Sequence, residues 1–272
     1  MTPRPYQSEA VALTVAALTD APRAQLIMAC GTGKTEVARW VADELKPVKM
    51  AFMAPSIALV AQTWRRWEAG GWRGRGLSIC SDSTARGNDD IRVEDAGLPA
   101  VSTDVEVAAA FLRADGPGVI FCTYQSADVL AEAARETGGL DLVVFDEAHR
   151  LAGRADSAYG VVLDDALLPA RRRLFMTATP KVYNAKAEDA LSMDDVDTFG
   201  PVAYSYSFGD AIRDGWLTDY NVAIFDVSDA AVRDAIADDQ DVSDAAAVFG
   251  LAKAMRRFDL RRGLTFHSRL SR

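Results

Sequence analysis

Short apolar runs alternate with longer stretches of helical spacing along most of the chain. Apolar runs bounded by turn residues indicate buried strands, and apolar positions recurring every three or four residues indicate helices. The runs that indicate strands are 26–29, 49–54, 77–80, 119–122, 140–145 and 174–176. Helical spacing is found at 8–18, 36–45, 57–67, 105–113, 127–136, 156–168, 184–193, 208–215 and 245–257. The alternation predicts a series of strand–helix units, with further strands at 220–227 and 263–267 and a long surface connection at 81–104.

The first predicted strand leads directly into Cys30-Gly-Thr-Gly-Lys-Thr35, and a helical stretch follows. In that order, Gly-x-Gly-Lys-Thr indicates phosphate binding, because glycines let backbone N–H groups surround an anion at a helix N-terminus. Lys34 would reach the β- and γ-phosphates of a nucleotide, and the Thr35 hydroxyl would hold Mg²⁺. Met28, on the strand side of the loop, stands where the full pattern has a glycine. The competing interpretation, a glycine-rich turn without a ligand, is disfavoured by a second nucleotide motif downstream.

That second motif is Asp146-Glu-Ala-His149, at the end of the predicted strand 140–145. An acidic pair at the end of an apolar strand is where the magnesium-holding carboxylate of a P-loop enzyme belongs. We expect Asp146 to hold the metal through water, and Glu147 to orient and deprotonate the attacking water. The alternative is a strand end with solvated carboxylates and a surface histidine. The ordered residue types after an apolar strand favour the catalytic interpretation.

Composition limits the class of protein. The chain has 272 residues, 49% of them hydrophobic and 25% charged, which suits one large globular domain plus part of another. No apolar run approaches the ~20 residues that span a bilayer, and the N-terminus has no apolar signal region, so we expect a cytoplasmic protein without a membrane partner. The cysteines Cys30, Cys80 and Cys122 are scattered and lie in or beside apolar runs, which predicts buried thiols without a metal.

The net charge of −9 by itself argues against nucleic-acid binding. The charge is uneven, however, because residues 1–80 hold ten basic and six acidic side chains, so the acidic excess lies in the remainder. A local basic face is sufficient for phosphate contact, so nucleic-acid binding stays open. We expect Arg171-Arg-Arg173 to be a solvated cluster before a strand rather than a nucleic-acid contact, and the aspartates of 226–244 to form a solvated face.

Two weaker motifs lie near the ends of the first 180 residues. Arg4-Pro-Tyr-Gln7 precedes a helical stretch. A glutamine amide can read an adenine edge and a tyrosine can stack on a base, although a plain helix N-terminus is the simpler interpretation of this tetrapeptide alone. Thr177-Ala-Thr-Pro180 places two hydroxyls at a strand end, where they can sense a γ-phosphate through a neighbour such as His149. Neither motif is specific by itself.

Taken together and in this order, the motifs resemble the first motor lobe of DEAH-type superfamily 2 helicases and translocases. The matching segments are Arg4-Pro-Tyr-Gln7, Cys30-Gly-Thr-Gly-Lys-Thr35, Ala54-Pro-Ser-Ile-Ala-Leu-Val-Ala-Gln62, Thr123-Tyr-Gln-Ser126, Asp146-Glu-Ala-His149 and Thr177-Ala-Thr-Pro180. The sequences of the lysine loop and of the stretch 192–220 resemble those of restriction-type and helicase-associated-domain bacterial members of this group. The resemblance implies an α/β, RecA-like P-loop fold: a mostly parallel sheet, helices on both faces, and the nucleotide at the carboxyl ends of the strands.

The resemblance also implies roles for individual residues. Lys34, Asp146 and Glu147 would be catalytic, and Thr35 and Asp146 would hold Mg²⁺. The residues expected at the ATP site are Arg4, Tyr6, Gln7, Cys30, Gly31, Thr32, Gly33, Lys34, Thr35, His149, Thr177 and Thr179. The residues expected to contact a nucleic acid, DNA in preference to RNA, are Pro55, Ser56, Gln62, Thr123 and Tyr124.

Relatives of this kind close the ATP site with arginines from a second RecA-like lobe, in a Gln-x-x-Gly-Arg-x-x-Arg pattern that the sequence lacks. We expect residues 1–218 to form the ATP-binding RecA-like domain and 219–272 the truncated beginning of a second lobe, with Thr265-Phe-His-Ser268 resembling its opening nucleic-acid motif. A missing arginine finger costs ~10³–10⁵ in turnover. The chain is therefore expected to bind ATP·Mg²⁺, to hydrolyse it slowly, and to need the second lobe in cis or in trans.

Two other functions stay open on the sequence alone. A nucleotide-dependent nucleic-acid-binding or regulatory module without motor activity of its own would fit the missing arginines and the acidic net charge. A P-loop kinase of small molecules would share the lysine loop, but it does not need the Asp-Glu-Ala-His and Thr-Ala-Thr motifs. The leading prediction is the ATP-binding and hydrolysing lobe of a DNA-directed motor of restriction or defence type.

Overall fold

The computed structural model describes residues 2–81, 96–154, 160–183, 190–220 and 242–261. The chain divides into two compact units, Met1–Thr218 and Asp219–Arg272. The first unit is built on a seven-stranded sheet, and every pairing in it is parallel. Its strands are, in spatial order, β3 (Arg75–Ile79), β4 (Gly118–Thr123), β2 (Lys49–Ala54), β5 (Leu142–Phe145), β7 (Arg173–Thr177), β1 (Arg23–Met28) and β9 (Val202–Tyr206).

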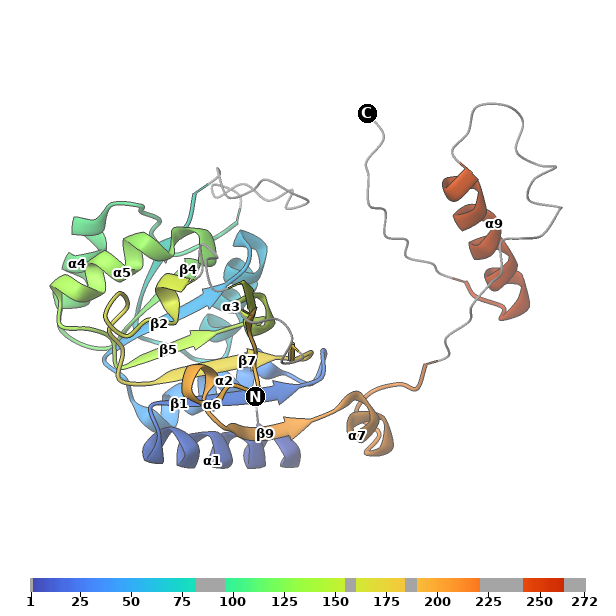
Figure 1. The fold of residues 1–272 in the computed structure, drawn as a ribbon, viewed down its shortest axis with the longest axis horizontal. Helices are drawn as coiled ribbons and strands as arrows, with labels where there is room; N and C mark the ends of the chain where they lie inside the picture. Colours follow the sequence, from blue (N-terminus) through green and yellow to red (C-terminus); the bar gives the residue numbers. More distant parts are fainter. Residues whose placement is uncertain (1, 82–95, 155–159, 184–189, 221–241, 262–272) are drawn as a thin grey trace. The chain divides into compact units, whose positions relative to one another are not determined.

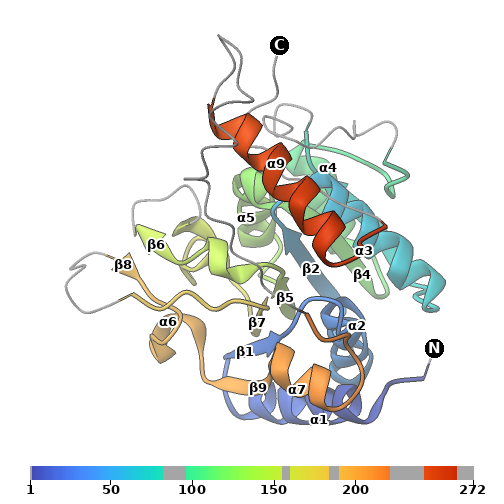
Figure 2. The same ribbon diagram turned by 90° about the vertical axis from the view of Figure 1, so that its right-hand side faces the viewer.

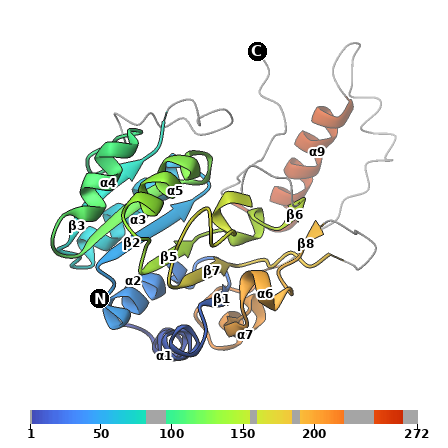
Figure 3. The same ribbon diagram turned by 60° about the vertical axis from the view of Figure 1, so that its left-hand side comes forward.

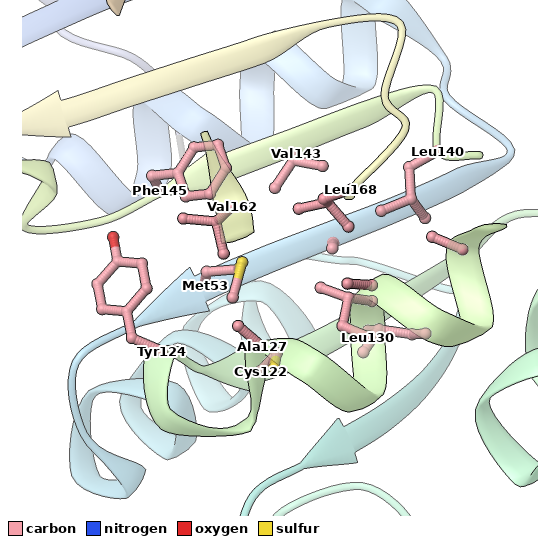
Figure 4. Packing of buried hydrophobic residues seen from close by; sticks show 14 of the residues in the cluster. Met53, Cys122, Tyr124, Ala127, Leu130, Leu140, Val143, Phe145, Val162 and Leu168 are labelled. Atoms are coloured by element: carbon pink, nitrogen blue, oxygen red, sulfur yellow. The ribbon is translucent and has the colours of Figure 1, made fainter. Parts of the chain in front are cut away.

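Helices cover both faces of this sheet (Figures 1 and 3). On one face α1 (Pro5–Asp20), α2 (Lys34–Leu45) and α3 (Ile57–Ala69) enclose an apolar core. On the other face α4 (Val105–Arg113) and α5 (Ala127–Glu136) enclose a second core, part of which is drawn in Figure 4. Because parallel strands are buried on both sides, they appear in the sequence as continuous apolar runs without alternation.

The strand order brings three loops to one edge of the sheet. β5, β7 and β1 are neighbours, with Phe145 opposite Phe175 and Ile27 opposite Thr177. Since the strands are parallel, the segments that leave β1, β5 and β7 all emerge at the carboxyl edge. These segments carry the lysine loop, the Asp146-Glu-Ala-His149 motif and the Thr177-Ala-Thr-Pro180 motif. The predicted α/β fold with a parallel sheet and helices on both faces is confirmed.

Short elements complete the first unit. The 3₁₀ turns are η3 (Tyr124–Ser126), η4 (Ala148–Arg150) and η5 (Gly160–Val162). β6 (Gly153–Arg154) and β8 (Ala190–Leu191) form a separate antiparallel pair. The helices α6 (Val196–Phe199) and α7 (Phe208–Arg213) flank β9, and Figure 2 shows α7 beside α1 and β9.

Some predicted elements are wrong. Residues 160–168 form a 3₁₀ turn and loops in place of the predicted helix, and residues 190–191 form a strand. The edge strand β9 was not predicted, because its sequence Val-Ala-Tyr-Ser-Tyr is only partly buried and shows no continuous apolar run. The predicted connection at 81–104 contains a fully buried Ala96. The predicted segments 155–159, 184–189, 221–227 and 263–267 lie outside the described residues.

Two predictions about single side chains are also corrected. Arg173 is 1% exposed, not solvated, and its guanidinium pairs with Asp165 and donates to the carbonyls of Leu168 and Ala170. Burial lowers the pKa of Arg173 to about 10, and these partners hold it charged. Cys30 is exposed because the chain leaves the strand at Met28, whereas Cys80 and Cys122 are buried as predicted.

In the second unit, the structure describes the helix α9 (Val242–Arg257), close to the predicted helix 245–257. The interpretation of this unit as the start of a second lobe stays a prediction. Within the described ranges no helix combines the length and the apolarity that crossing a bilayer requires.

Candidate active site

The loop between β1 and α2 depends on two glycines with left-handed backbone. Gly31 has φ 82° and Gly33 has φ 90°, a region that side chains disfavour. Gly33 is also the N-cap of α2, and a Cβ placed on it would lie 2.5 Å from Gln7 Nε2. The first N–H groups of a helix have no intrahelical partner, so this turn directs donors and a partial positive charge at an anion.

Lys34 and Thr35 begin α2. The Lys34 side chain is 9% exposed, and its Nζ donates to the carbonyl of Met28, 3.2 Å away. That contact folds the ammonium back across the loop toward the end of β1. The Thr35 carbonyl accepts a 3.2 Å hydrogen bond from Trp67 Nε1 of α3, and the Thr35 side chain is half-buried. The lysine is thus positioned at the mouth of the anion-binding turn.

The N-terminal motif Arg4-Pro-Tyr-Gln7 holds this loop through hydrogen bonds. Tyr6 Oη and Gln7 Nε2 both donate to the Thr32 carbonyl, at 2.9 and 2.8 Å, and Gln7 Oε1 accepts from the Arg4 backbone N–H at 2.9 Å. Tyr6 is 6% exposed and stacks on Tyr206 with ring centroids 4.4 Å apart. The Tyr6 ring is thus covered by protein and its hydroxyl supports the loop, and the expectation that Tyr6 belongs to the ATP site stays a prediction. The adenine-reading role of Gln7 stays a prediction.

Asp146 lies at the end of β5, 6% exposed. Its Oδ1 accepts from the Glu147 N–H at 3.0 Å, and its carbonyl accepts from Tyr124 Oη at 2.7 Å. Burial and, second to it, the Glu147 carboxylate raise the pKa of Asp146 to about 6 against the opposing charge of Lys34. Lys34 and Asp146 follow β1 and β5, which end at the same edge of the sheet with β7 between them. A buried carboxylate with a raised pKa is a group that a bound cation would stabilise.

Glu147, His149 and Thr177 form a connected group across the ends of β5 and β7. His149 Nδ1 lies 3.3 Å from Glu147 Oε2 and 2.9 Å from Thr177 Oγ1, which in turn accepts from the Thr179 N–H. Glu147 has φ 52°, a strained value of the kind that concentrates at functional sites. Burial lowers the pKa of His149 despite the nearby Glu147 carboxylate, so the imidazole is neutral at pH 7.

A pocket of about 550 Å³ opens at the glycine turn Gly31 to Gly33, and its volume is within the roughly 300–1,000 Å³ of small-molecule sites. It is lined by Thr2, Arg4, Gln7, Gly31, Thr32, Gly33, Glu36, Arg66, Ala69 and Gly70. A larger hollow of about 710 Å³ beside Lys49 and Asp141 contains none of the motif residues. Among the described residues no group of three or more His, Cys, Asp or Glu could hold a metal. A magnesium ion would therefore need the oxygens of a nucleotide in addition to Thr35 and Asp146.

The predicted nucleic-acid residues divide into two groups. Ser56 is half-buried and caps α3 by accepting from the Leu59 N–H at 3.3 Å, and Gln62 is exposed on the same helix. Pro55, Thr123 and Tyr124 are buried. The surrounding protein covers these three side chains, and the expectation that the residues lie near a bound nucleic acid stays a prediction. Figure 4 shows Tyr124 next to Phe145 and Met53, where its hydroxyl supports Asp146.

Sequence reasoning missed the residues that close the site from the C-terminal side of the first unit. The Arg4 guanidinium lies 4.5 Å from the ring centroid of Trp216, whose ring is 5.7 Å from that of Tyr6. Leu217 Cδ2 would be 3.4 Å from a Cβ on Gly31. Trp216 and Leu217 are remote from the loop in sequence, so local periodicity carries no signal for these contacts.

Comparison with known families now decides the assignment. The model of the family described as "Type III restriction enzyme, res subunit" matches residues 1–182. The chain belongs to this res-subunit family. The matched residues contain β1, β5 and β7 with all three motifs at their ends. The resemblance to the first lobe of a restriction-type superfamily 2 helicase is thereby confirmed.

Individual relatives agree with the res-subunit assignment. The chain is 29% identical over 224 residues to the probable helicase A859L of African swine fever virus, and 27% identical over 232 residues to the type I restriction enzyme EcoAI endonuclease subunit of Escherichia coli. These matches cover 80% and 83% of this chain. The chain spans 24% of the length of each of these relatives, so it corresponds to one part of them.

Two solved structures are similar in both sequence and fold. The Type ISP restriction-modification enzyme LlaBIII, bound to DNA, is 31% identical with a TM-score of 0.68 over 81% of this chain. A nuclease-deletion mutant of the Type ISP enzyme LlaGI, in complex with a DNA substrate mimic, is 29% identical with a TM-score of 0.64 over 86%. The chain covers 16% and 22% of those proteins. Both comparisons confirm the RecA-like architecture.

Proposed function

We propose that this res-subunit chain is the ATP-binding and hydrolysing lobe of a DNA-directed motor. The observation that carries the proposal is the parallel strand order β5-β7-β1, which brings Lys34 and Asp146, directly after β1 and β5, to the same carboxyl edge of the sheet. A buried amine, a buried carboxylate and free helix N–H donors suit a magnesium-bound triphosphate. The proposed metal is Mg²⁺, held by Thr35 and Asp146 together with the nucleotide.

Each residue then has a chemical task. Lys34 and the N–H groups that open α2 bind the phosphates, and Asp146 and Thr35 orient the bound ion, which would neutralise charge that develops on the transferred group. Glu147 Oε2 accepts a proton from the attacking water. His149 holds Glu147 through Nδ1, and the same atom contacts Thr177 Oγ1, so the catalytic carboxylate is tied to the end of β7.

The partners are proposed from the relatives. LlaBIII and LlaGI were solved with DNA or a DNA mimic, which supports DNA in preference to RNA as the track of this chain. Ser56 and Gln62 are the accessible members of the expected contact set. A second RecA-like lobe, in cis or in trans, would supply the arginines that this sequence lacks. The DEAH-type assignment and a cytoplasmic location remain predictions.

Titration of the chain with ATP in the presence of Mg²⁺ tests the nucleotide site. Lys34→Ala should weaken ATP affinity by about tenfold or more, because it removes a buried cation that pairs with phosphate. Lys46→Asn is the matched control: it removes the same charge from the opposite end of α2, and asparagine tolerates the left-handed backbone of φ 50° there. Equal ATP affinity of Lys34→Ala and the unsubstituted chain would show that the phosphate assignment is wrong.

A regulatory module without motor activity remains the second candidate, favoured by the absence of the second-lobe arginine pattern from the sequence. The two candidates differ in how ATP turnover responds to DNA. A motor lobe should hydrolyse ATP faster when DNA and a second lobe carrying the arginines are added. A binding module should show no such increase.

A further inference from the structure

Arg66 lies in the last turn of α3 and lines the pocket that contains the glycine turn Gly31 to Gly33. Its neighbour Trp67 is fully buried and donates from Nε1 to the Thr35 carbonyl at 3.2 Å. This bond fixes the end of α3 against the first turn of α2. The position of the Arg66 backbone at the pocket is thus set by packing rather than by a mobile loop.

The Arg66 guanidinium is unpaired in the part of the chain that the structure describes. Among the described residues, the Arg66 guanidinium makes no hydrogen bond and no ion pair. Glu36, the acidic residue in the pocket lining, is paired with Arg39 at 3.3 Å, and Arg39 also binds Asp43 at 2.8 Å. The adjacent Arg65, in contrast, donates to the Ala96 carbonyl at 2.6 Å. Arg66 therefore brings an unpaired fork of N–H donors to the pocket.

Arg66 shares its pocket with the residues that open α2. The same pocket is lined by Gly31, Thr32 and Gly33, whose turn directs backbone N–H donors at an anion. An unpaired cation beside this turn is suited to the same anion, and a guanidinium matches phosphate oxygens in a bidentate manner.

We propose that Arg66 binds the phosphate chain of the nucleotide held by the loop after β1. The inference rests on the proposed function, since it requires ATP in that pocket, and it adds a positioning residue from α3. The 13-residue helix α3 would then carry a phosphate contact at its end and the expected DNA contact Ser56 at its N-cap.

Affinity measurements on the full chain with ATP, ADP and adenosine, in the presence of Mg²⁺, test this inference. Arg66→Gln should weaken ATP and ADP binding by about tenfold to a hundredfold and leave adenosine unchanged, because the lost bonds are to phosphate. The affinities of Arg66→Lys for ATP and ADP should lie between those of Arg66→Gln and those of the unsubstituted chain, since lysine keeps the charge and loses the planar fork of donors. Arg65→Gln, which removes the same charge one position away, should bind all three ligands as the unsubstituted chain does.

The outcomes separate this inference from the proposed function. If Lys34→Ala loses ATP affinity and Arg66→Gln does not, the nucleotide site stands and the role of Arg66 is overturned. If adenosine affinity falls as much as ATP affinity in Arg66→Gln, the arginine does not act on phosphate and the inference is overturned. Failure of the unsubstituted chain to bind ATP overturns both. Melting temperatures of all variants show whether an affinity loss comes from misfolding.

Discussion

At the scale of single residues, burial decides the chemistry of the acidic motif. Asp146 and Glu147 are adjacent carboxylates, but Asp146 is 6% exposed while the Glu147 side chain is 26% exposed. Burial, together with the Glu147 carboxylate, raises the pKa of Asp146 from its ordinary value of 3.8 to about 6. The tasks proposed for the two groups differ accordingly: Asp146 is a carboxylate that a cation would stabilise, and Glu147 is accessible to a water molecule.

The raised pKa of Asp146 predicts the effect of Asp146→Asn on stability. The pKa of Asp146 is higher in the folded state than in the unfolded state, so the ionised carboxylate destabilises the fold. This destabilisation grows from about pH 4 to about pH 6 and stays at its full size at higher pH. Without Mg²⁺ and nucleotide, Asp146→Asn should raise the free energy of unfolding at pH 7.5 by at most about 3 kcal/mol and have little effect at pH 4. Urea unfolding at both pH values measures this, and a variant less stable at pH 7.5 would contradict it.

At the scale of elements, the phosphate loop is held by neighbours that are distant in sequence. α1 supplies Tyr6 and Gln7, which share the Thr32 carbonyl, and α3 supplies Trp67, which binds the Thr35 carbonyl. β9 supports Tyr6 through the ring of Tyr206. The loop is thus prepared before any ligand binds, which lowers the entropy that binding must overcome.

Gly33→Ala should disturb this prepared loop. The added Cβ meets Gln7 Nε2 at 2.5 Å, and φ 90° is unfavourable for alanine. We expect a loss of about 1 kcal/mol of stability together with weaker ATP binding. The control is Gly116→Ala, where φ is 80° and nothing lies within 4 Å of the added Cβ. Gly116→Ala should lose only the stability that alanine costs in a left-handed backbone. A normal ATP affinity for Gly33→Ala would argue against the idea that the contact of Gln7 with the loop prepares it for ATP.

At the scale of the whole molecule, the first unit has a core on each face of its sheet. Every residue proposed for the nucleotide site, together with Trp216 and Leu217, lies within Met1–Thr218. A compact unit with its own cores folds independently when few contacts cross its boundary. The predicted boundary between residues 218 and 219 can therefore be tested by shortening the chain.

A chain of residues 1–218 should unfold cooperatively and bind ATP within about twofold of the full chain, and saturating ATP·Mg²⁺ should raise its Tm. A chain of residues 1–199 is the control, since it lacks β9, which pairs with β1 and carries the Tyr206 ring against Tyr6. It should be less stable and bind ATP more weakly. Calorimetry with and without nucleotide measures both effects. Non-cooperative melting of residues 1–218 would show that the boundary is wrong.

Particular residues show which features of the structure can be predicted from local sequence patterns. The strands that form the middle of the sheet were predictable because burial on both faces requires continuous apolar runs. β9 was missed because its sequence is only partly buried and contains no such run. The places of Lys34, Asp146 and Glu147 directly after strands were predictable from their motifs, and their chemical roles stay predictions. Arg66 and Trp216 carry no motif, and the contacts they make depend on elements that folding brings together.

The sequence alone thus determined the family, the strand–helix order and the identity of the nucleotide motifs, since each of these depends on neighbours along the chain. Only the tertiary structure decided which of those motif residues are accessible. It buried Thr123 and Tyr124, covered Tyr6 and exposed Cys30. Accessibility is a property of packing between distant segments, and the parallel strand order that brings β1, β5 and β7 together sets that packing.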